Sequence, residues 1–318
     1  MKNSLPKLIG KRCLAAATSL VFVVVTVFAV TNILPGDATD ALLGQNATPQ
    51  TVAALRHGMG LDQPIFFRFW SWLWAAVHGE FGHSLLNGLS VADAIGPRLH
   101  NSLLLAGAAA LIAVPASLFL GITSAIWKDT FYDRIVSIMT LGVVSVPEFV
   151  IATIAVYVFS VRLHLLPAIV DVGSVHSLGQ FLYAFFMPVT TLALVSLAQM
   201  VRMTRAAMAD TLSASYIEMA LLKGIGPVRL ILVHALPNAL GPIVNAVALS
   251  LSSLLGGVVV IEVVFTYPGI AGLMVDAVSS RDVPMVQACA LVFCVTYLIL
   301  TTFADIVTIL SLPRGRKA

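Results

Sequence analysis

Acidic residues in apolar surroundings are the side chains of this sequence best suited to chemistry. Glu148 lies in the middle of a long apolar stretch, and Glu262 and Asp305 lie near the ends of two others. A carboxylate at the centre of a bilayer costs roughly 2.5–3.5 kcal/mol on insertion scales, so such a group usually faces a cavity or a partner. If these stretches cross a membrane, Glu148 and Glu262 are therefore candidates for lining a path through it.

Each of these carboxylates also has a structural interpretation. Glu148 follows Pro147, which has no N–H, so a protonated carboxyl at this position would satisfy backbone groups that the proline leaves unbonded. Glu262 and Asp305 lie close to the ends of their stretches, which favours a structural role for both. For Glu148 the sequence leaves both interpretations open.

Motifs for nucleotide binding and catalysis do not occur in the chain. It contains no G-x-x-x-x-G-K-[ST] phosphate loop, no H-E-x-x-H zinc helix and no G-x-S-x-G nucleophile elbow. The 7 histidines lack the i, i+4 spacing of a helical metal pair, and the 3 cysteines have neither the spacing of a zinc site nor the number of a disulfide framework. We therefore expect no catalytic site, no cofactor and no metal in this chain.

The composition argues against a soluble globular protein. Of the 318 residues, 59% are hydrophobic and 10% are charged, whereas roughly 25% of the residues of an ordinary soluble domain are charged. The net charge of +3 is too small to indicate a nucleic-acid partner. The composition indicates a membrane protein instead.

Six apolar stretches are long enough to cross a membrane. A helix needs about 20 mostly apolar residues to do so, because each residue advances it by about 1.5 Å. The third stretch is the weakest, since Glu148 lies in its middle. The first is too long for a cleaved signal peptide and lacks an A-x-A site before Pro35, so we expect it to remain as an anchor. The stretches are 13–33, a segment within 101–127, 135–161, 181–201, 239–261 and 283–304.

The distribution of lysine and arginine predicts the orientation of these six spans. With the amino terminus inside, the inner segments hold 13 of the basic residues and the outer segments hold 5. Because cytoplasmic loops carry an excess of Lys and Arg, both termini are predicted to be cytoplasmic. The outer basic residues are Arg56, Arg68, Arg98, Arg162 and Arg281.

The outer segment after the first span is long and contains several local signals. A turn is predicted at 35–37, where Pro-Gly-Asp ends the first helix, and a short polar helix at 50–56 has Thr48 available as its N-cap. Segment 64–77 is too short to span and is rich in aromatic residues. Its rings either lie at the membrane interface or pack on neighbouring helices. These aromatic residues are Phe66, Phe67, Phe69, Trp70, Trp72 and Trp74.

The longest inner loop, 202–238, is predicted to contain a helix. Ser213 and Ser215 are available to cap it, and Glu218 in its first turn complements the helix dipole. Gly224 is expected to end it, because glycine accepts the left-handed conformation at a helix C-terminus.

A second helix is predicted to follow the glycine break in this loop. Gly226 precedes Pro227, which suits the first position of a helix because a proline there has no N–H to leave unbonded. Apolar residues continue over 228–233 until Pro237 redirects the chain. The loop is thus expected to present a helix, a glycine break and a second helix between two spans.

A motif with specific spacing lies in this loop. It reads Glu218-Met219-Ala220-x3-Gly224-x9-His234-Ala235-Leu236-Pro237. It resembles the E-A-A-x3-G-x9-I-x-L-P loop of membrane subunits in binding-protein-dependent ATP-binding-cassette (ABC) importers, and departs from it at Met219 and His234. In that family the first helix of the loop is a coupling helix that lies in a groove of the nucleotide-binding subunit.

The resemblance implies the same role here, in contrast to an inert cytoplasmic hairpin. Gly224 would allow the bend, while Tyr216, Met219 and Ala220 would supply a small contact surface. The residues that the resemblance assigns to ATPase coupling are Tyr216, Glu218, Met219, Ala220, Gly224 and Pro237.

Further motifs in the right order extend the resemblance to nearly the whole chain. They look like those of the dipeptide, oligopeptide and nickel permease branch, in particular its subunit with a long outer loop after the first span. Glu148 stands where this branch often has an uncharged residue, which makes it a candidate determinant of substrate preference. The motifs are Leu34-Pro35-Gly36-Asp37, Gly60-Leu61-Asp62-Gln63-Pro64, Gly79-Glu80-Phe81-Gly82-His83-Ser84, Leu166-Pro167-Ala168 and Glu262-Val263-Val264-Phe265-Thr266-Tyr267-Pro268-Gly269.

The resemblance implies an all-α membrane protein of the type I ABC importer permease fold, with six transmembrane helices, in a bacterial inner membrane. Residues 1–98 would form the first span and the extracytoplasmic segment, 99–310 the permease core with its coupling loop at 202–238, and 311–318 a cytoplasmic tail.

The function that the resemblance implies is that of a permease subunit for peptides or similar small solutes. A second homologous permease subunit would complete the pathway, two ATPase subunits would bind and hydrolyse ATP, and an extracytoplasmic solute-binding protein would deliver the ligand. The alternative is an ion-coupled secondary transporter, which would need inverted repeats and broken mid-membrane helices, and the sequence contains no such repeat.

Overall fold

The computed structural model describes residues 5–33, 50, 62–170, 172–174 and 177–311. In this part of the chain all elements are helices, apart from one isolated β-bridge between His83 and Ser90. The prediction of an all-α protein is therefore confirmed. The chain forms two compact units, which are described separately. One comprises Met1–Ala16, Leu103–Tyr267 and Tyr297–Ala318, and the other comprises Ala17–Ser102 and Pro268–Thr296.

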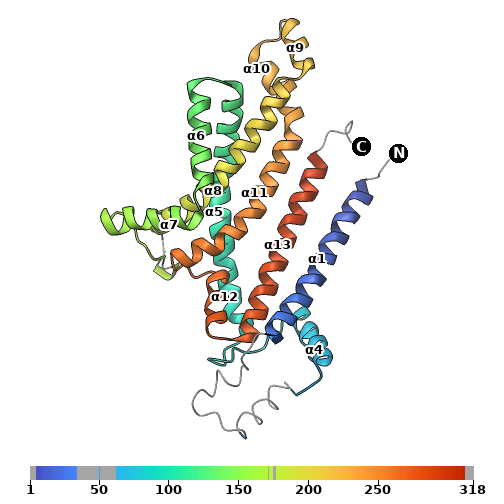
Figure 1. The fold of residues 1–318 in the computed structure, drawn as a ribbon, viewed down its shortest axis with the longest axis vertical. Helices are drawn as coiled ribbons and strands as arrows, with labels where there is room; N and C mark the ends of the chain where they lie inside the picture. The colour runs from blue at the N-terminus through green and yellow to red at the C-terminus, as the bar shows by residue number, and fades with distance from the viewer. Residues whose placement is uncertain (1–4, 34–49, 51–61, 171, 175–176, 312–318) are drawn as a thin grey trace. The chain divides into compact units, whose positions relative to one another are not determined.

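Five described helices are long and apolar enough to cross a membrane. Each contains one of the predicted spans and extends beyond it, because the helix continues into sequence that is polar enough to leave the hydrocarbon core. The five helices, coloured from blue to red along the chain in Figure 1, are α1 (Leu5–Ile33), α5 (Val91–Ile126), α8 (Leu178–Leu212), α11 (Leu236–Val264) and α13 (Val283–Ser311).

The third predicted span is not the single helix expected over 135–161. It consists of α6 (Phe131–Ser145), α7 (Glu148–Ala155) and a π-helical turn, η2 (Val156–Arg162), and the two halves are bent by 98° (Figure 1). The cause is Pro147, which has no N–H and disfavours a helical conformation for the residue before it. Val146 is accordingly extended, with φ −101° and ψ 130°. The chain has six spans if this bent pair is one of them.

Helix α8 is the centre of the larger unit, where it packs against α6, α7 and α11. The apolar core between these helices also includes the segment that follows α11, with Phe265 and Tyr267 fully buried. The ring of Tyr267 meets that of Phe185 edge to face, with centroids 5.5 Å apart. The Phe265 carbonyl accepts a hydrogen bond from the N–H of Val170 at 3.4 Å. The part of the motif up to Tyr267 therefore closes the end of this core.

In the smaller unit, the aromatic segment forms α4 (Ile65–Val77). Some of its rings pack on a neighbouring helix, and others are exposed. Phe69 and Trp72 pack on Phe28 of α1, with ring centroids 5.1 and 5.6 Å from it. Arg68 adds a hydrogen bond of 2.7 Å to the side-chain oxygen of Asn32. These rings are packing residues. The exposed rings, which remain candidates for the membrane interface, are Phe66, Phe67, Trp70 and Trp74.

The motif at 79–84 has a structural role in the same unit. The hydroxyl of Ser84 donates to the carboxylate of Asp282 at 2.5 Å, and the N–H of Leu85 donates to the same carboxylate at 3.2 Å. Phe81 packs on an apolar cluster that includes Ile270 of α12 (Ile270–Ser279). Two other predictions, the turn at 35–37 and the helix at 50–56, lie outside the described residues except for residue 50.

Candidate functional site

The loop between α8 and α11 begins with the short helix α9 (Ser215–Leu222). The predicted serine caps were wrong, because Ala214 is the N-cap and no side chain caps the helix. The hydroxyl of Ser213 instead donates to the carbonyl of Asp210 at 3.0 Å, within the last turn of α8. Ser215 is already inside α9, so neither serine has its oxygen free at the capping position.

Gly224 ends α9, as predicted. Its φ is +80°, a conformation that glycine adopts without the steric cost paid by other residues. The N–H of Gly224 donates to the Leu221 carbonyl at 2.9 Å, and the N–H of Ile225 donates to the Ala220 carbonyl at 3.3 Å. These two bonds form a Schellman motif, and the Ile225 side chain packs on the core below α9, a contact that often accompanies such motifs.

The two faces of α9 have different surroundings. Ile217 and Ala220 are 4% and 8% exposed and pack on a core cluster with Met208 of α8. Tyr216 and Met219 are 45% and 54% exposed. Ala220, one of the three residues expected to supply a contact surface, therefore does not belong to the exposed face. It lies one helical turn after Ile217 on the inner face. The exposed face is formed by Tyr216, Glu218, Met219, Leu221 and Leu222.

The second helix of the loop runs into the membrane helix without a break. Gly226 is the N-cap and Pro227 occupies the first turn of α10 (Pro227–Arg229), as predicted. The expected redirection at Pro237 was wrong, because α10, η4 (Leu230–Ala235) and α11 form one 38-residue helix. The π-helical turn η4 accommodates the proline, whose ring and missing N–H disrupt an ordinary α-helical turn.

A buried ion pair ties together the helix ends beside this loop. Arg205 of α8 binds both carboxylate oxygens of Asp133 on α6, at 2.6 and 2.7 Å. The same carboxylate accepts hydrogen bonds from the Ser124 hydroxyl at 2.5 Å and from the N–H of Asp129 at 3.0 Å. Asp133 is 3% exposed. Such a bidentate, fully bonded pair fixes α6, α8 and the end of α5 in one arrangement.

Glu148, the first residue of α7, lies against α11. A Cβ placed on Gly257 would be 2.6 Å from the Glu148 Oε1 atom, so the carboxylate occupies the space that a side chain would fill. This oxygen is buried and has no hydrogen-bond partner among the described residues. The other pathway candidate, Glu262, is 1% exposed and lies within the α11 core. The structure therefore favours the structural role for Glu262.

Sequence reasoning missed Asp133, Arg205 and Gly257. The sequence does not identify the partners of the ion pair, because Asp133 has Arg134 beside it and Arg205 has Arg202 nearby, all near the ends of apolar stretches. The signal for Gly257 was the pair of adjacent glycines inside an apolar helix, which indicates a close approach by another group.

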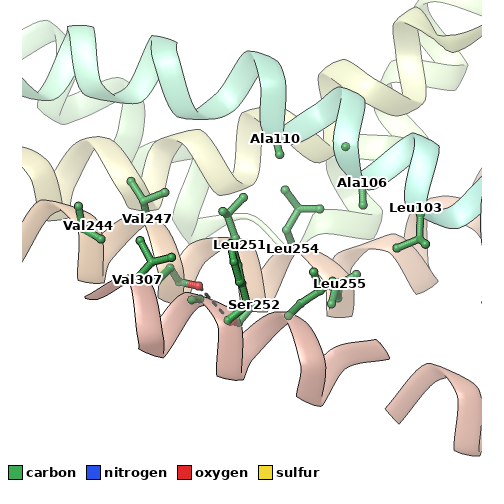
Figure 2. A pocket seen from close by; sticks show the side chains of 15 residues that line it. Leu103, Ala106, Ala110, Val244, Val247, Leu251, Ser252, Leu254, Leu255 and Val307 are labelled. Carbon is green, nitrogen blue, oxygen red and sulfur yellow. Dashed lines mark hydrogen bonds between the residues drawn. The ribbon is translucent and has the colours of Figure 1, made fainter. Parts of the chain in front are cut away.

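Two hollows in the larger unit differ in their polarity. One, of about 350 Å³, lies between α5, α11 and α13 and is lined almost entirely by apolar side chains (Figure 2). Its one hydroxyl, that of Ser252, already donates to the Ala248 carbonyl at 3.0 Å. This hollow offers no polar recognition. The other is an open groove of about 600 Å³ between α6 and α8, lined by Ser137, Leu141, Gln199, Arg202, Met203, Arg205 and Ala206.

Replacement of Gly224 by alanine is expected to open the end of α9. A left-handed conformation costs a residue with a Cβ roughly 1–2 kcal/mol, which corresponds to about five- to thirtyfold more opening. Trypsin cleavage after the exposed Lys223 reports this opening, once normalised to cleavage of the unfolded chain. Gly226→Ala is the matched control, because Gly226 has φ −61° and no atom within 4 Å of an added Cβ. Equal cleavage of the two variants would contradict the role of Gly224.

The amino-acid sequence is similar to known families and proteins over most of its length. The model of the family described as "Binding-protein-dependent transport system inner membrane component" matches residues 117–317, and that of "Binding-prot-dependent transport system membrane comp, N-term" matches 5–102. The glutathione transport system permease proteins GsiC of Escherichia coli (strain K12) and Shigella dysenteriae serotype 1 are both similar to the chain. Each is 34% identical to it over 296 residues, which cover 93% of this chain and 94% of the relative.

Proposed function

Because the chain belongs to the family of binding-protein-dependent transport system inner membrane components, we propose that it forms half of a translocation pathway for peptides or similar small solutes. It is a permease subunit of an ABC importer and a multi-pass protein of a bacterial inner membrane, and ATP is hydrolysed by separate subunits. The family relationship does not favour the ion-coupled alternative.

The proposed solute class is supported by the relatives. The GsiC proteins are named for glutathione transport, and glutathione is a small peptide. The open groove between α6 and α8 supplies polar side chains of the kind that a charged, water-soluble solute would need, including Gln199 and Arg202. Glu148 is the further candidate for this pathway.

The family works in complexes with ATPase subunits and a binding protein. For this chain we propose one second, homologous permease subunit, two ATPase subunits and one extracytoplasmic solute-binding protein. The extensive apolar surface of α6 and α7 supports contact with a second subunit or with lipid, since Ile138, Met139 and Phe149 are all exposed in the single chain.

The proposed mechanism depends on α9. One face of this helix is exposed and mostly apolar, and the other face is buried in the core. An ATPase groove would cover the exposed face around Tyr216 and Met219. Displacement of α9 would then pass to the core through Ile217 and Ala220, and along the continuous helix from Pro227 to Val264. The ion pair between Asp133 and Arg205 would make α6 and α8 follow as one body.

This role places the loop and both termini in the cytoplasm, in agreement with the excess of basic residues on that side. We propose the corresponding division of the chain. Residues 1–98 hold the first span and the extracytoplasmic segment, 99–310 the permease core with its coupling loop at 202–238, and 311–318 a cytoplasmic tail. The bounds of the two matching family models, 5–102 and 117–317, support this division.

Reconstitution of the complete complex tests the proposal. The chain would be co-purified with the products of its neighbouring genes and placed in liposomes with the binding protein. Uptake of glutathione or alanyl-alanine is expected only with hydrolysable ATP on the ATPase side. Accumulation of either solute by this chain alone, or uptake driven by an ion gradient without ATP, would contradict the proposed function.

A further inference from the structure

A carboxylate lies directly at the break in the third span. Helix α6 ends at Ser145, and Glu148 is the first residue of α7 after the 98° bend. Non-helical backbone at membrane depth is tolerated only where it is buried in protein or borders a water-filled cavity. Ser145, Val146 and Pro147 are exposed in the single chain. The break therefore borders either the pathway or another subunit.

Both carboxylate oxygens of Glu148 lie against α11, where a Cβ on Gly257 would be 2.6 Å from Oε1 and 2.8 Å from Oε2. The Oε1 atom is packed on the bare backbone of α11 at Gly257 and has no hydrogen-bond partner within the described residues. The residue as a whole remains partly exposed. The side chain is thus held in place by packing, while the residue stays partly exposed.

An ionised carboxylate in this position would be stabilised by a cationic hydrogen-bond donor. Within the described residues, no Lys, Arg or His is found in an ion pair with Glu148, whereas Asp305 and Asp133 pair with Arg12 and Arg205. Bonds between a cation and a carboxylate are roughly twice as strong as neutral hydrogen bonds. A cationic partner for an ionised Glu148 would therefore come from outside the described residues.

We propose that Glu148 binds the ammonium group of the solute as it passes the break in the third span. This inference rests on the proposed function. Peptides and glutathione carry an ammonium group that can bind a carboxylate, and the partly exposed Glu148 directly follows the exposed break at 145–147. Close approach of α7 to the bare Gly257 backbone positions the carboxylate.

The first test compares solutes with and without the ammonium group. The complete complex is reconstituted, and alanyl-alanine and glutathione are each compared with their N-acetyl derivatives, at concentrations that saturate the binding protein. Glu148→Gln keeps the shape of the side chain and removes its charge. It should reduce uptake of the amine-bearing peptide about tenfold or more, and uptake of the N-acetyl form less than twofold. Glu148→Asp should restore part of the preference.

The second test displaces the carboxylate without replacing it. Gly257→Ala places a Cβ 2.6 Å from Oε1, so the flexible side chain must swing away from its position. The same selective loss of amine-bearing solutes is expected. Gly256→Ala is the matched control, because it makes the same change one residue earlier on α11 and its Cβ meets no atom within 4 Å.

Three results with Glu148→Gln would overturn the inference. The substitution could leave the uptake of both solute forms unaffected, or reduce the uptake of both equally. It could also cause loss of the second permease subunit from the complex, which would indicate that Glu148 binds that subunit instead. Equal effects of Gly257→Ala and Gly256→Ala would overturn the inference as well. If the unaltered complex transports none of these peptides, the proposed solute class fails together with this inference. If the variants show normal ATP-driven uptake with unchanged selectivity between the two solute forms, this inference fails and the proposed function stands.

Discussion

Met219→Arg is expected to abolish ATP-driven uptake while the chain remains folded and inserted. The Met219 side chain points away from the core of its own chain, so the substitution does not disturb packing. In the assembled transporter this side chain would lie in the ATPase groove, where a new charge would lose its water without gaining a partner. Substitutions at the centre of an interface commonly cost at least about 2 kcal/mol, which corresponds to roughly thirtyfold weaker binding.

Retention of the ATPase subunits during purification is the direct readout for this variant, followed by uptake in liposomes. Val278→Arg is the matched control, since Val278 is also an exposed apolar residue, on α12. It should leave the ATPase subunits bound. Met219→Arg with full ATPase retention and normal uptake would show that α9 is not the docking element.

Asp133→Ala is expected to have the largest effect on stability. It leaves the Arg205 guanidinium beside an apolar side chain, and the Ser124 hydroxyl and the Asp129 N–H lose their acceptor at the same time. The Arg205 side chain is 28% exposed, so the cost should fall below the roughly 3–5 kcal/mol typical of a fully buried pair, and should be about 1.5–3 kcal/mol. The free energy of unfolding of the purified chain, measured by denaturant titration in detergent, checks this value.

The second ion pair of the described chain provides the control for this measurement. Arg12 and Asp305 are 3.2 Å apart, but their side chains are 56% and 38% exposed. Exposed pairs contribute about 0–1 kcal/mol, so Asp305→Ala should change the free energy of unfolding little. Similar losses for Asp133→Ala and Asp305→Ala would contradict the structural role assigned to the Asp133–Arg205 pair.

Spans were predictable because the length of an apolar run is a local property. Five runs became single helices, each containing the predicted residues. The break at Pro147 was not predicted, although the proline was visible, because the apolar residues continue on both sides of it. Hydropathy cannot distinguish a straight helix from two halves that meet at an angle. The angle depends on the packing of α7 against α8 and α11, which are distant in the sequence.

The structure of the loop at 202–238 was predicted in part for the same reason. Gly224 and Pro227 act through their own backbone conformations, so their roles could be inferred from residue type alone. The orientation of α9 could not, because apolar residues occur on both of its faces and their spacing does not say which face is buried. Packing on Met208 placed Ala220 inside and left Met219 outside.

Site-specific photo-cross-linking of the assembled transporter tests the central claim most directly. A benzophenone amino acid would replace Met219 on α9 or, as a reference, the exposed Trp74 on α4. If α9 connects ATP hydrolysis to the membrane helices, position 219 will cross-link to an ATPase subunit and position 74 will not. A transport-active complex in which position 219 cross-links only to lipid or to the solute-binding protein would contradict that claim.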